Sequence, residues 1–374
     1  MPSKNELFVG LMSGTSLDAI DAALVSFNEQ PSRRVELVAT HEHPFPADIR
    51  TALHEIIESP HAVDLDQLGQ LDRGLGLLYA DAVNTLLHDS AIDAESVSAI
   101  GNHGQTIRHR PDTTPAFTLQ IGDAATIANG CKITTVSDFR SADVALGGQG
   151  APLAPAFHQW AFADDDRPGF VVNIGGLANI TVLRPGAPLI GFDTGPGNTL
   201  MDGWCAEHQG ENFDRGGRWA SGGTVIESLL EALLADPYFA KPAPKSTGRE
   251  YFNTAWLASL LNKTKAVNAR DIQTTLAELT AQSIAISITQ HADSGAVWLC
   301  GGGALNTDLT DRIKTHLPAF ELATTAELGI PPEWVEAVAF AWLARERLHG
   351  AAAGIPSVTG ASASGILGSI NLPA

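Results

Sequence analysis

Leu-Phe-Val-Gly-Leu-Met-Ser-Gly-Thr-Ser-Leu-Asp-Ala-Ile-Asp-Ala-Ala-Leu, at residues 7–24, is the stretch around which the rest of the sequence is best understood. Apolar residues on both sides of a run of small residues predict two strands joined by a glycine turn. Gly10 and Gly14 lack the Cβ atoms that would keep a ligand away from the backbone. This stretch is therefore either a phosphate cradle or an ordinary hairpin, and the two interpretations differ in what its polar residues do.

The polar residues of the turn have the chemistry that a phosphate site needs. Ser13, Thr15 and Ser16 carry hydroxyls next to backbone N–H groups. Asp18 and Asp21 add carboxylates that can hold a metal ion or a water molecule near bound phosphates. Both interpretations stay open on this stretch alone, because a glycine-serine turn is common.

Length and composition restrict the class of protein. The chain has 374 residues, more than one hydrophobic core usually supports, so we expect two domains. Lysine and arginine number 23 against 42 aspartates and glutamates, and the net charge of −19 opposes binding to nucleic acid or to an anionic membrane. Three widely spaced cysteines, no leading apolar run and no membrane-length apolar stretch predict a reduced, cytoplasmic protein.

The same order of strand, glycine turn and strand begins again at Gly169. Residues 170–183 hold this unit, with two glycines at its centre, and a third strand at 189–193 leads into a glycine-rich turn and a helix at 199–209. The strand at 296–300 then runs into three consecutive glycines, on which a flat group such as a nucleotide base or ribose can lie. Two halves that repeat the same order of elements predict an α/β protein with two similar domains.

Two other polar segments follow predicted strands of the first half. These segments are 101–106 and 137–140, and open α/β sheets place their ligands at such strand ends. Helical spacing over 47–59 and 64–89 supplies the helices between the strands. The glycine-rich run at 142–150 is the expected passage to the second half, and a final helix at about 334–348 precedes a tail of small residues.

This layout is that of the actin-like ATPase superfamily, and within it the chain closely resembles the anhydro-N-acetylmuramic acid kinase family. The matching segments follow the family order over nearly the whole chain. They are Gly-Leu-Met-Ser-Gly-Thr-Ser-Leu-Asp at 10–18, Gly-Asn-His-Gly-Gln-Thr at 101–106, Ser-Asp-Phe-Arg at 137–140, Asn-Ile-Gly-Gly-Leu-Ala-Asn at 173–179, Phe-Asp-Thr-Gly-Pro-Gly-Asn at 192–198 and Ser-Thr-Gly-Arg-Glu at 246–250. One departure is Ala19, where the family pattern more often has glycine.

The resemblance implies a fold and a division into domains. We expect an α/β protein of two actin-like, ribonuclease H-like domains, each a mixed five-stranded sheet flanked by helices, with an ATP cleft between them. Residues 1–145 form the N-terminal domain in this prediction, and 146–349 form the C-terminal domain with its adenosine-binding element. The tail, about 350–374, is expected to pack back on the N-terminal domain.

The resemblance also implies an activity. Such a kinase uses ATP and water to open the 1,6-anhydro ring of anhydro-N-acetylmuramic acid while it phosphorylates O6, which gives N-acetylmuramic acid 6-phosphate in peptidoglycan recycling. We expect Mg²⁺ with mostly water ligands to offset the triphosphate charge. The expected partners are this small sugar substrate and a second copy of the chain in a homodimer, and neither nucleic acid nor a membrane.

Residue roles follow from the matching motifs. Asp193 matches the general base that activates water, and Asp18 is the expected metal ligand, directly or through water. The expected ATP contacts are Gly14, Thr15, Ser16, Asp18, Asp21, Gly175, Gly176, Gly301, Gly302 and Gly303.

Three further residues are assigned to the sugar, together with Asp193. Arg140 either pairs with the lactyl carboxylate or belongs to a structural ion pair. His103 either bonds sugar hydroxyls or caps its loop, and Glu336 either contacts the sugar or is plain solvent surface.

Two other classes of function compete with this one. Asp193-Thr194-Gly195 also matches the Asp-Thr-Gly of an aspartic protease with Asp293 as the second aspartate, but the many helical segments argue against that nearly all-β fold. A non-catalytic nucleotide-binding scaffold is the other alternative, and the presence of Asp193 argues against it. A P-loop enzyme is excluded because its motif does not occur.

Overall fold

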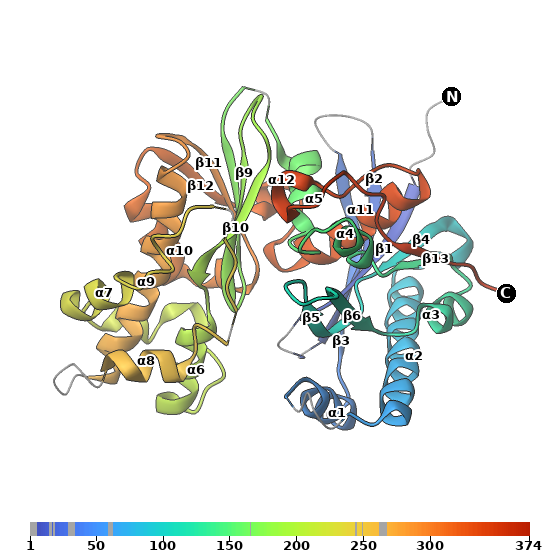
Figure 1. Cartoon of the computed structure of the whole chain (residues 1–374), viewed down its shortest axis with the longest axis horizontal. Coiled ribbons are helices and arrows are strands. Elements are labelled where there is room, and N and C mark those ends of the chain that lie inside the picture. Colours follow the sequence, from blue (N-terminus) through green and yellow to red (C-terminus); the bar gives the residue numbers. More distant parts are fainter. Residues whose placement is uncertain are drawn as a thin grey trace. The chain divides into compact units, whose positions relative to one another are not determined.

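The computed structural model describes the chain except for residues 1–5, 15, 16, 18, 29–33, 59–62, 165, 244, 249 and 262–267 (Figure 1). It consists of two compact units, Met1–Ala161 with Trp334–Ala374, and Phe162–Glu333, called unit 1 and unit 2 below. In the described part of the chain, no helix is long and apolar enough to cross a membrane.

Unit 1 contains strands from both ends of the chain. Its strands are β1 (Glu6–Ser13), β2 (Ala19–Phe27), β3 (Val35–Pro44), β4 (Val97–Asn102), β5 (Gln105–Arg110), β6 (Phe117–Ile121), β7 (Thr135–Ser137) and β13 (Ser369–Asn371). Its helices are α1 (Ala47–Glu58), α2 (Leu65–Asp89), α3 (Ala124–Cys131), α4 (Ser141–Ala145), α5 (Ala154–Phe162), α11 (Val335–Leu348) and α12 (Pro356–Thr359).

The main sheet of unit 1 is mixed. Its strand order is β13-β7-β4-β1-β2-β3, and the antiparallel meander β1-β2-β3 is followed by β4 and β7, which run parallel to β1. The short strand β13 pairs antiparallel with β7 and makes a sixth strand at that edge. Strands β5 and β6 form a separate two-stranded ribbon, although the sequence suggested only a loop at 101–106.

Helix α11 lies against the main sheet at a point where two glycines face it. Gly10 of β1 and Gly101 of β4 are direct neighbours in the parallel register. A β-carbon on Gly10 would overlap the carbonyl oxygen of Ala337, and one on Gly101 would overlap the carbonyl oxygen of Phe340. Gly10 therefore allows a helix to approach, whereas the sequence suggested that it allows a ligand to approach.

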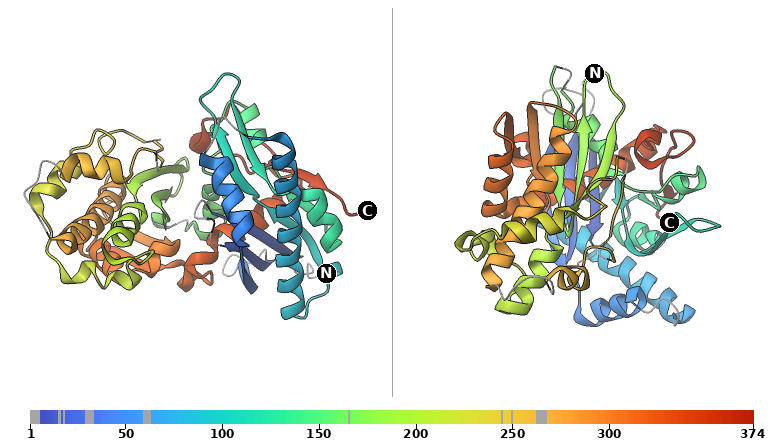
Figure 2. Two further views of the ribbon diagram at one scale, coloured as in Figure 1. Left: turned by 90° about the horizontal axis from the view of Figure 1, so that it is seen from below. Right: turned by 60° about the vertical axis from the view of Figure 1, so that its left-hand side comes forward.

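The opposite face of this sheet is covered by α2. Val9 and Leu11 alternate with Gly10 along β1, and they share a buried cluster with Leu75, Tyr79 and other residues of α2. Asp64 caps this helix by accepting a hydrogen bond from the N–H of Asp66 at 2.8 Å. Figure 2 shows α2 running beside α3.

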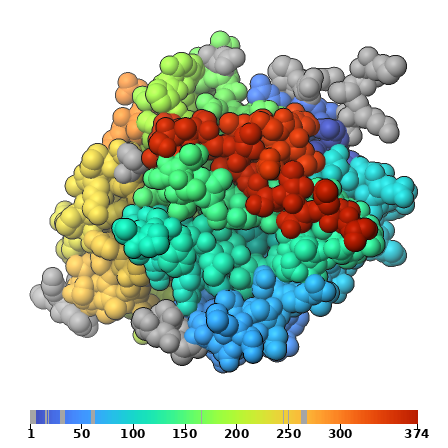
Figure 3. Space-filling view, turned by 45° about the vertical axis from the view of Figure 1, so that its right-hand side comes forward, coloured from blue at the N-terminus to red at the C-terminus, as the bar shows by residue number. Residues whose placement is uncertain are grey.

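The C-terminal tail belongs to unit 1. Besides β13, the N–H of Ser362 donates to the carbonyl of Leu146, and the N–H of Gln149 donates to the carbonyl of Thr359. In Figure 3 this segment, in red, lies across the green and teal surface of the same unit. The tail therefore packs within unit 1.

Unit 2 repeats the topology of unit 1. Its strands are β8 (Gly169–Ile174), β9 (Leu177–Leu183), β10 (Ile190–Pro196), β11 (Gly295–Cys300) and β12 (Phe320–Thr324). Its α-helices are α6 (Thr199–Gln209), α7 (Glu227–Leu234), α8 (Thr254–Leu261), α9 (Ala269–Thr289) and α10 (Thr307–His316). The sheet order is β10-β9-β8-β11-β12, an antiparallel meander followed by two strands parallel to β8.

This order matches β3-β2-β1-β4-β7 strand for strand, so the internal repeat and the mixed α/β class are both confirmed. The core of unit 2 joins the inner residues of its sheet, such as Val172 and Ile180, to the central helix α9. Helix α9 is buried along most of its length, and Asn268 caps its start by accepting from the N–H of Arg270 at 3.0 Å.

The two units end at different residues from the domains expected from the sequence. Residues 146–161 and 334–349 lie in unit 1, whereas the sequence analysis assigned them to the second domain. The physical reason is α11, whose residues from Ala337 to Ala344 are buried, as expected of a helix that is apolar on all sides. Periodicity identifies such a helix as buried but does not say which sheet it covers.

We expect Gly10→Ala to lower the free energy of unfolding by about 3 kcal/mol or more, because the new methyl group meets backbone atoms that cannot turn away. Chemical denaturation followed by circular dichroism measures the change. Gly69→Ala is the matched control, since a β-carbon there meets no atom within 4 Å, and helix propensity should stabilise this variant by up to about 1 kcal/mol. Equal stability of Gly10→Ala and the wild type would contradict the close packing.

Candidate active site

Asp193 lies in a row of three polar residues across the sheet of unit 2. In the antiparallel register Asn173 of β8 faces Asn179 of β9, and Asn179 faces Asp193 of β10. Residues directly opposite each other in antiparallel strands point to the same face of the sheet, so the three side chains lie side by side. All three are partly exposed, although their neighbours along the strands are mostly buried.

A register shift follows Asp193 directly. The pairing of β10 with β9 slips between Asp193 and Gly195, and such irregularities are frequent where a strand redirects a side chain near a site. Gly195 has a φ of 153°, and a β-carbon there would lie 2.7 Å from the ring of Phe239. The bend in β10 therefore requires glycine and brings the segment around Phe239 against the end of the strand.

The Asp193 carboxylate is held by one backbone donor. The N–H of Thr247 donates to Oδ2 at 3.0 Å. Burial raises the pKa of Asp193 to about 6, and the Thr247 hydrogen bond opposes this shift without cancelling it. A carboxylate with a pKa near 6 is ionised at neutral pH and is a stronger base than an ordinary aspartate.

Three glycine segments of unit 2 meet beside this row. The N–H of Gly197 donates to the carbonyl of Gly176, and the N–H of Asn198 donates to the carbonyl of Gly175, which joins the β8–β9 turn to the start of α6. β-carbons on Gly301 and Gly303 would collide with Asn173 and Ile174. The glycines that the sequence assigned to ATP in this half of the chain therefore do lie together.

The third glycine segment leaves one position open. Gly302 is exposed, and a β-carbon there would meet nothing within 4 Å, in contrast to Gly301 and Gly303. Asn306 then starts α10 by accepting a hydrogen bond from the N–H of Leu309 at 3.1 Å. Gly301 and Gly303 are thus needed for packing, and the backbone of this segment is left uncovered at Gly302.

A second group of predicted site residues lies in unit 1. The Arg140 Nη2 and Nε atoms donate to Nε2 of His103 at 2.9 and 3.3 Å, and Nη1 donates to the carbonyl of Gly150 at 2.8 Å. The ring of His103 packs on Phe340 of α11 with a centroid separation of 4.6 Å. His103 and Arg140 therefore form one cluster.

The hydrogen bonds of His103 determine its tautomer. Because Nε2 accepts from a guanidinium, the proton of the neutral ring must be on Nδ1. Nδ1 is buried and has no hydrogen-bond partner. Burial, and secondarily the positive charge of Arg140, hold the pKa of His103 well below its usual 6.5 against the opposing effect of the Gly104 backbone, so the ring is neutral.

Two carboxylates act on Arg140. Burial lowers the pKa of Arg140 to about 10, and the negative charges of Glu336 and Asp143 act to raise it. The guanidinium therefore stays charged at neutral pH. The Glu336 side chain is exposed, yet desolvation by the protein around it raises the pKa of its carboxyl, and the positive charge of Arg140 opposes that shift. Asp143 is buried and accepts from the N–H of Gly150 at 2.7 Å, which fixes the carbonyl that Arg140 uses.

The first glycine turn is described only in part. Thr15, Ser16 and Asp18, three of the expected ATP contacts, lie outside the described residues. Gly14 accepts a hydrogen bond from the N–H of Leu17 at 3.4 Å, and Asp21 is partly exposed on β2. The Ser13 hydroxyl is buried and bonds Tyr79 at 2.6 Å, so it faces the core.

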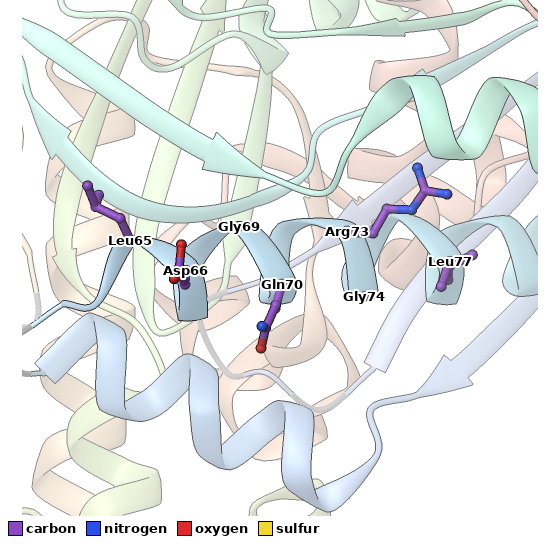
Figure 4. A pocket seen from close by; sticks show the side chains of 7 residues that line it. All are labelled: Leu65, Asp66, Gly69, Gln70, Arg73, Gly74 and Leu77. Carbon is purple, nitrogen blue, oxygen red and sulfur yellow. The ribbon is translucent and has the colours of Figure 1, made fainter.

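Among the described residues, no group of three or more His, Cys, Asp or Glu side chains is arranged to hold a metal ion. One pocket of about 510 Å³ is formed entirely by the surface of α2 (Figure 4). Gly69 and Gly74 leave a notch there between Leu65 and Leu77, and no predicted site residue lines it. A larger cavity, of about 600 Å³, lies in unit 2 next to Arg215 and Trp219.

Sequence reasoning missed the residues that hold these groups in place. Asp143 and Phe340 carry no local signal, because their roles depend on contacts between distant parts of the chain. The Ser-Thr-Gly-Arg-Glu motif at 246–250 was noticed, but no role was assigned to Thr247. Its position in a family motif was the available signal.

We expect the His103 ring to stay neutral, with its proton on Nδ1, through the pH range around 6.5 in which an ordinary histidine becomes protonated. Because its folded pKa is lowered, protonation in the unfolded state should cost folding stability as pH falls below 6.5. Nitrogen-15 NMR of histidine-labelled protein tests this, with His103→Phe to assign the signal. A signal that titrates near pH 6.5 would contradict the buried tautomer.

The chain has distant likeness to solved structures and strong likeness to curated proteins. A ROK hexokinase from Thermus thermophilus is 17% identical over 91% of this chain and 99% of that one, with a TM-score of 0.36. The family model for anhydro-N-acetylmuramic acid kinase matches residues 6–373. The anhydro-N-acetylmuramic acid kinase of Shewanella amazonensis is 51% identical, covering 97% of each chain, and that of Coxiella burnetii is 49% identical, covering 98% of this chain and 97% of its own. On these sequence matches, the chain belongs to the anhydro-N-acetylmuramic acid kinase family.

Proposed function

We propose that this member of a kinase family uses ATP and water to open the 1,6-anhydro ring of anhydro-N-acetylmuramic acid and phosphorylate its O6. The observation that carries the proposal is the Asp193 carboxylate, which sits beside the converging glycine segments of unit 2 with its pKa raised to about 6. The proposed site therefore has a base that can activate water next to glycine backbone that can bind phosphates.

The reaction balances without further reactants. Asp193 takes a proton from water, whose oxygen forms a bond to the anomeric carbon C1. The C1–O6 bond breaks, and O6 accepts the γ-phosphoryl group of ATP. The products are N-acetylmuramic acid 6-phosphate and ADP, and Asp193 returns its proton to solvent.

The nucleotide would be held mainly by backbone. We assign the phosphates to Gly175 and Gly176 and the adenosine to Gly301, Gly302 and Gly303, since the bare backbone at Gly302 suits a flat group. Gly14 and Asp21 of unit 1, with Thr15, Ser16 and Asp18, are assigned to the same nucleotide by the family motif.

Mg²⁺ fits this site as an ion that keeps several waters and takes its other ligands from the phosphates, because no protein cage of three ligands is found among the described residues. Asp18 would hold it directly or through water. When bound, the ion would offset the charge of the triphosphate.

The sugar would meet the cluster around His103. Its Nδ1–H is a buried donor beside the Gly104 backbone with no acceptor in hydrogen-bond geometry, which leaves it available to a sugar hydroxyl or carbonyl oxygen. Arg140 orients that ring and brings a positive charge suited to the lactyl carboxylate. Glu336 is assigned to a sugar hydroxyl, and the Phe340 ring packs against the imidazole at an interplanar angle of 45°.

Two alternatives are less well supported. A non-catalytic scaffold would not need a carboxylate with a raised pKa, and the helices that cover both sheets do not fit an aspartic protease. The expected homodimer and cytoplasmic location stay predictions.

Mass spectrometry of the products from anhydro-N-acetylmuramic acid, ATP and ¹⁸O-water tests the proposed function. We expect one ¹⁸O atom at the anomeric hydroxyl and the phosphate on O6, because water attacks C1 while O6 leaves. A phosphorylated sugar with an intact anhydro bridge would show that the chain is a simple kinase.

The acidic limb of the pH profile of kcat/KM should fall near pH 6, since Asp193 must be ionised and kcat/KM reports groups of the free enzyme. Activity should drop about tenfold per pH unit below that point.

Asp193→Asn should lose at least about 100-fold in kcat while ADP still binds, as measured by calorimetry. The matched control is Asp293→Asn, which changes an exposed aspartate of the same unit and should behave as wild type.

A further inference from the structure

Three residues from one segment surround Asp193 with hydrogen bonds. The hydroxyl of Tyr238 donates to the backbone carbonyl of Asp193 at 2.7 Å. The backbone N–H of Asp193 donates to the carbonyl of Lys245 at 3.0 Å, and the N–H of Thr247 reaches its carboxylate at 3.0 Å. Both backbone groups and one side-chain oxygen of Asp193 are thus fixed from the same side.

We propose that Tyr238, Lys245 and Thr247, named here the Asp193 clamp, position the Asp193 carboxylate for the ring-opening step, with Tyr238 as the positioning residue. The inference rests on the proposed role of Asp193 as the base. Tyr238 acts through Asp193 and does not itself touch substrate in this proposal.

The clamp is held together by its own contacts. The Lys245 ammonium lies 4.7 Å from the ring centroid of Tyr238 and donates to the carbonyls of Tyr238 and Phe239, each at 3.3 Å. Tyr238 is 1% exposed, so its hydroxyl has little freedom to find another acceptor. Lys245 and Tyr238 therefore cannot shift independently.

A layer of aromatic rings, formed by Tyr238, Tyr251, Phe252 and Trp256, packs against the clamp. Asp236 accepts hydrogen bonds at 2.9 Å from the N–H of Tyr238 and from the indole of Trp256. Burial acts to raise the pKa of Asp236, but its hydrogen bonds outweigh it and keep the pKa low. The ring of Phe252 packs between Tyr238 and Trp256, at centroid distances of 5.3 and 5.0 Å.

The geometry has a direct catalytic consequence. Because Thr247 takes Oδ2, the carboxylate cannot rotate freely, and its other oxygen keeps one direction toward the attacking water. Tyr238 and Thr247 also line a cavity of about 190 Å³, which leaves room for solvent next to the clamp. Positioning of this kind contributes to kcat and not to nucleotide binding.

Tyr238→Phe is the test, because it keeps the ring and removes only the hydroxyl that bonds Asp193. We expect kcat to fall about tenfold with the KM for ATP unchanged. The acidic limb of kcat/KM should also move up by roughly 0.5 pH unit, since a mobile carboxylate loses part of its bond to the Thr247 N–H. The folded state is verified by circular dichroism and the melting temperature.

Tyr251→Phe is the matched control. Tyr251 belongs to the same aromatic layer, but its hydroxyl donates to Asp236 at 2.8 Å and the residue is 40% exposed. Its kcat and pH limb should equal those of the wild type. If Tyr238→Phe and Tyr251→Phe give the same kcat and the same limb, the clamp has no positioning role.

Two further variants, Lys245→Gln and Asp193→Asn, separate failure of the clamp from failure of the proposed base. If Tyr238→Phe does not fold, Lys245→Gln is judged by the same two readouts, because it removes the ammonium that ties Lys245 to Tyr238. An active wild type with an inactive Asp193→Asn and an unaffected Tyr238→Phe overturns the clamp alone. Retained activity of Asp193→Asn overturns the proposed base itself.

Discussion

Helix α11 and the sheet of unit 1 touch backbone to backbone, and this contact organises the cluster around His103. At Gly10 and Gly101 the strands have no side chain, so the carbonyls of Ala337 and Phe340 lie where β-carbons would be. The same approach brings the Phe340 ring onto His103. A helix held further out by even two methyl groups would carry Phe340 away from that ring, so the packing of the core and the donor at His103 depend on the same two glycines.

The equivalent strand order in the two units shows how one topology serves two kinds of chemistry. Each meander turns on a glycine segment, and polar residues gather where strands end, as in other α/β sheets. Unit 2 carries the row of Asn173, Asn179 and Asp193 next to its glycine segments. Unit 1 carries a buried imidazole and a guanidinium instead. The repeat supplies the framework, and a few side chains at the strand ends differentiate the two halves.

Local patterns predicted most strands and helices of both units, the repeat, and Asp193 at the end of a strand before a glycine turn, but not the strands β5, β12 and β13. They could not predict that α11 covers β1, because that contact joins residues from opposite ends of the chain. They also missed the role of Gly10, since glycine permits both ligand approach and helix approach and only the three-dimensional neighbour distinguishes them. The role of Tyr238 was not predicted, for a similar reason. Its hydroxyl donates to a backbone carbonyl, and any residue type at position 193 offers that acceptor.

Burial moves the pKa values of Asp193 and His103 in opposite directions. Burial disfavours charge at both positions, which raises the pKa of the carboxyl and lowers that of the imidazole. At Asp193 a backbone N–H limits the shift, so the group stays ionised at neutral pH while remaining basic. At His103 the guanidinium of Arg140 adds to the shift, so the ring stays neutral and keeps its proton on Nδ1. Burial thus yields a base at Asp193 and a neutral ring at His103, while the hydrogen-bond donor beside each group limits the first shift and adds to the second, and each outcome suits the role assigned to that residue.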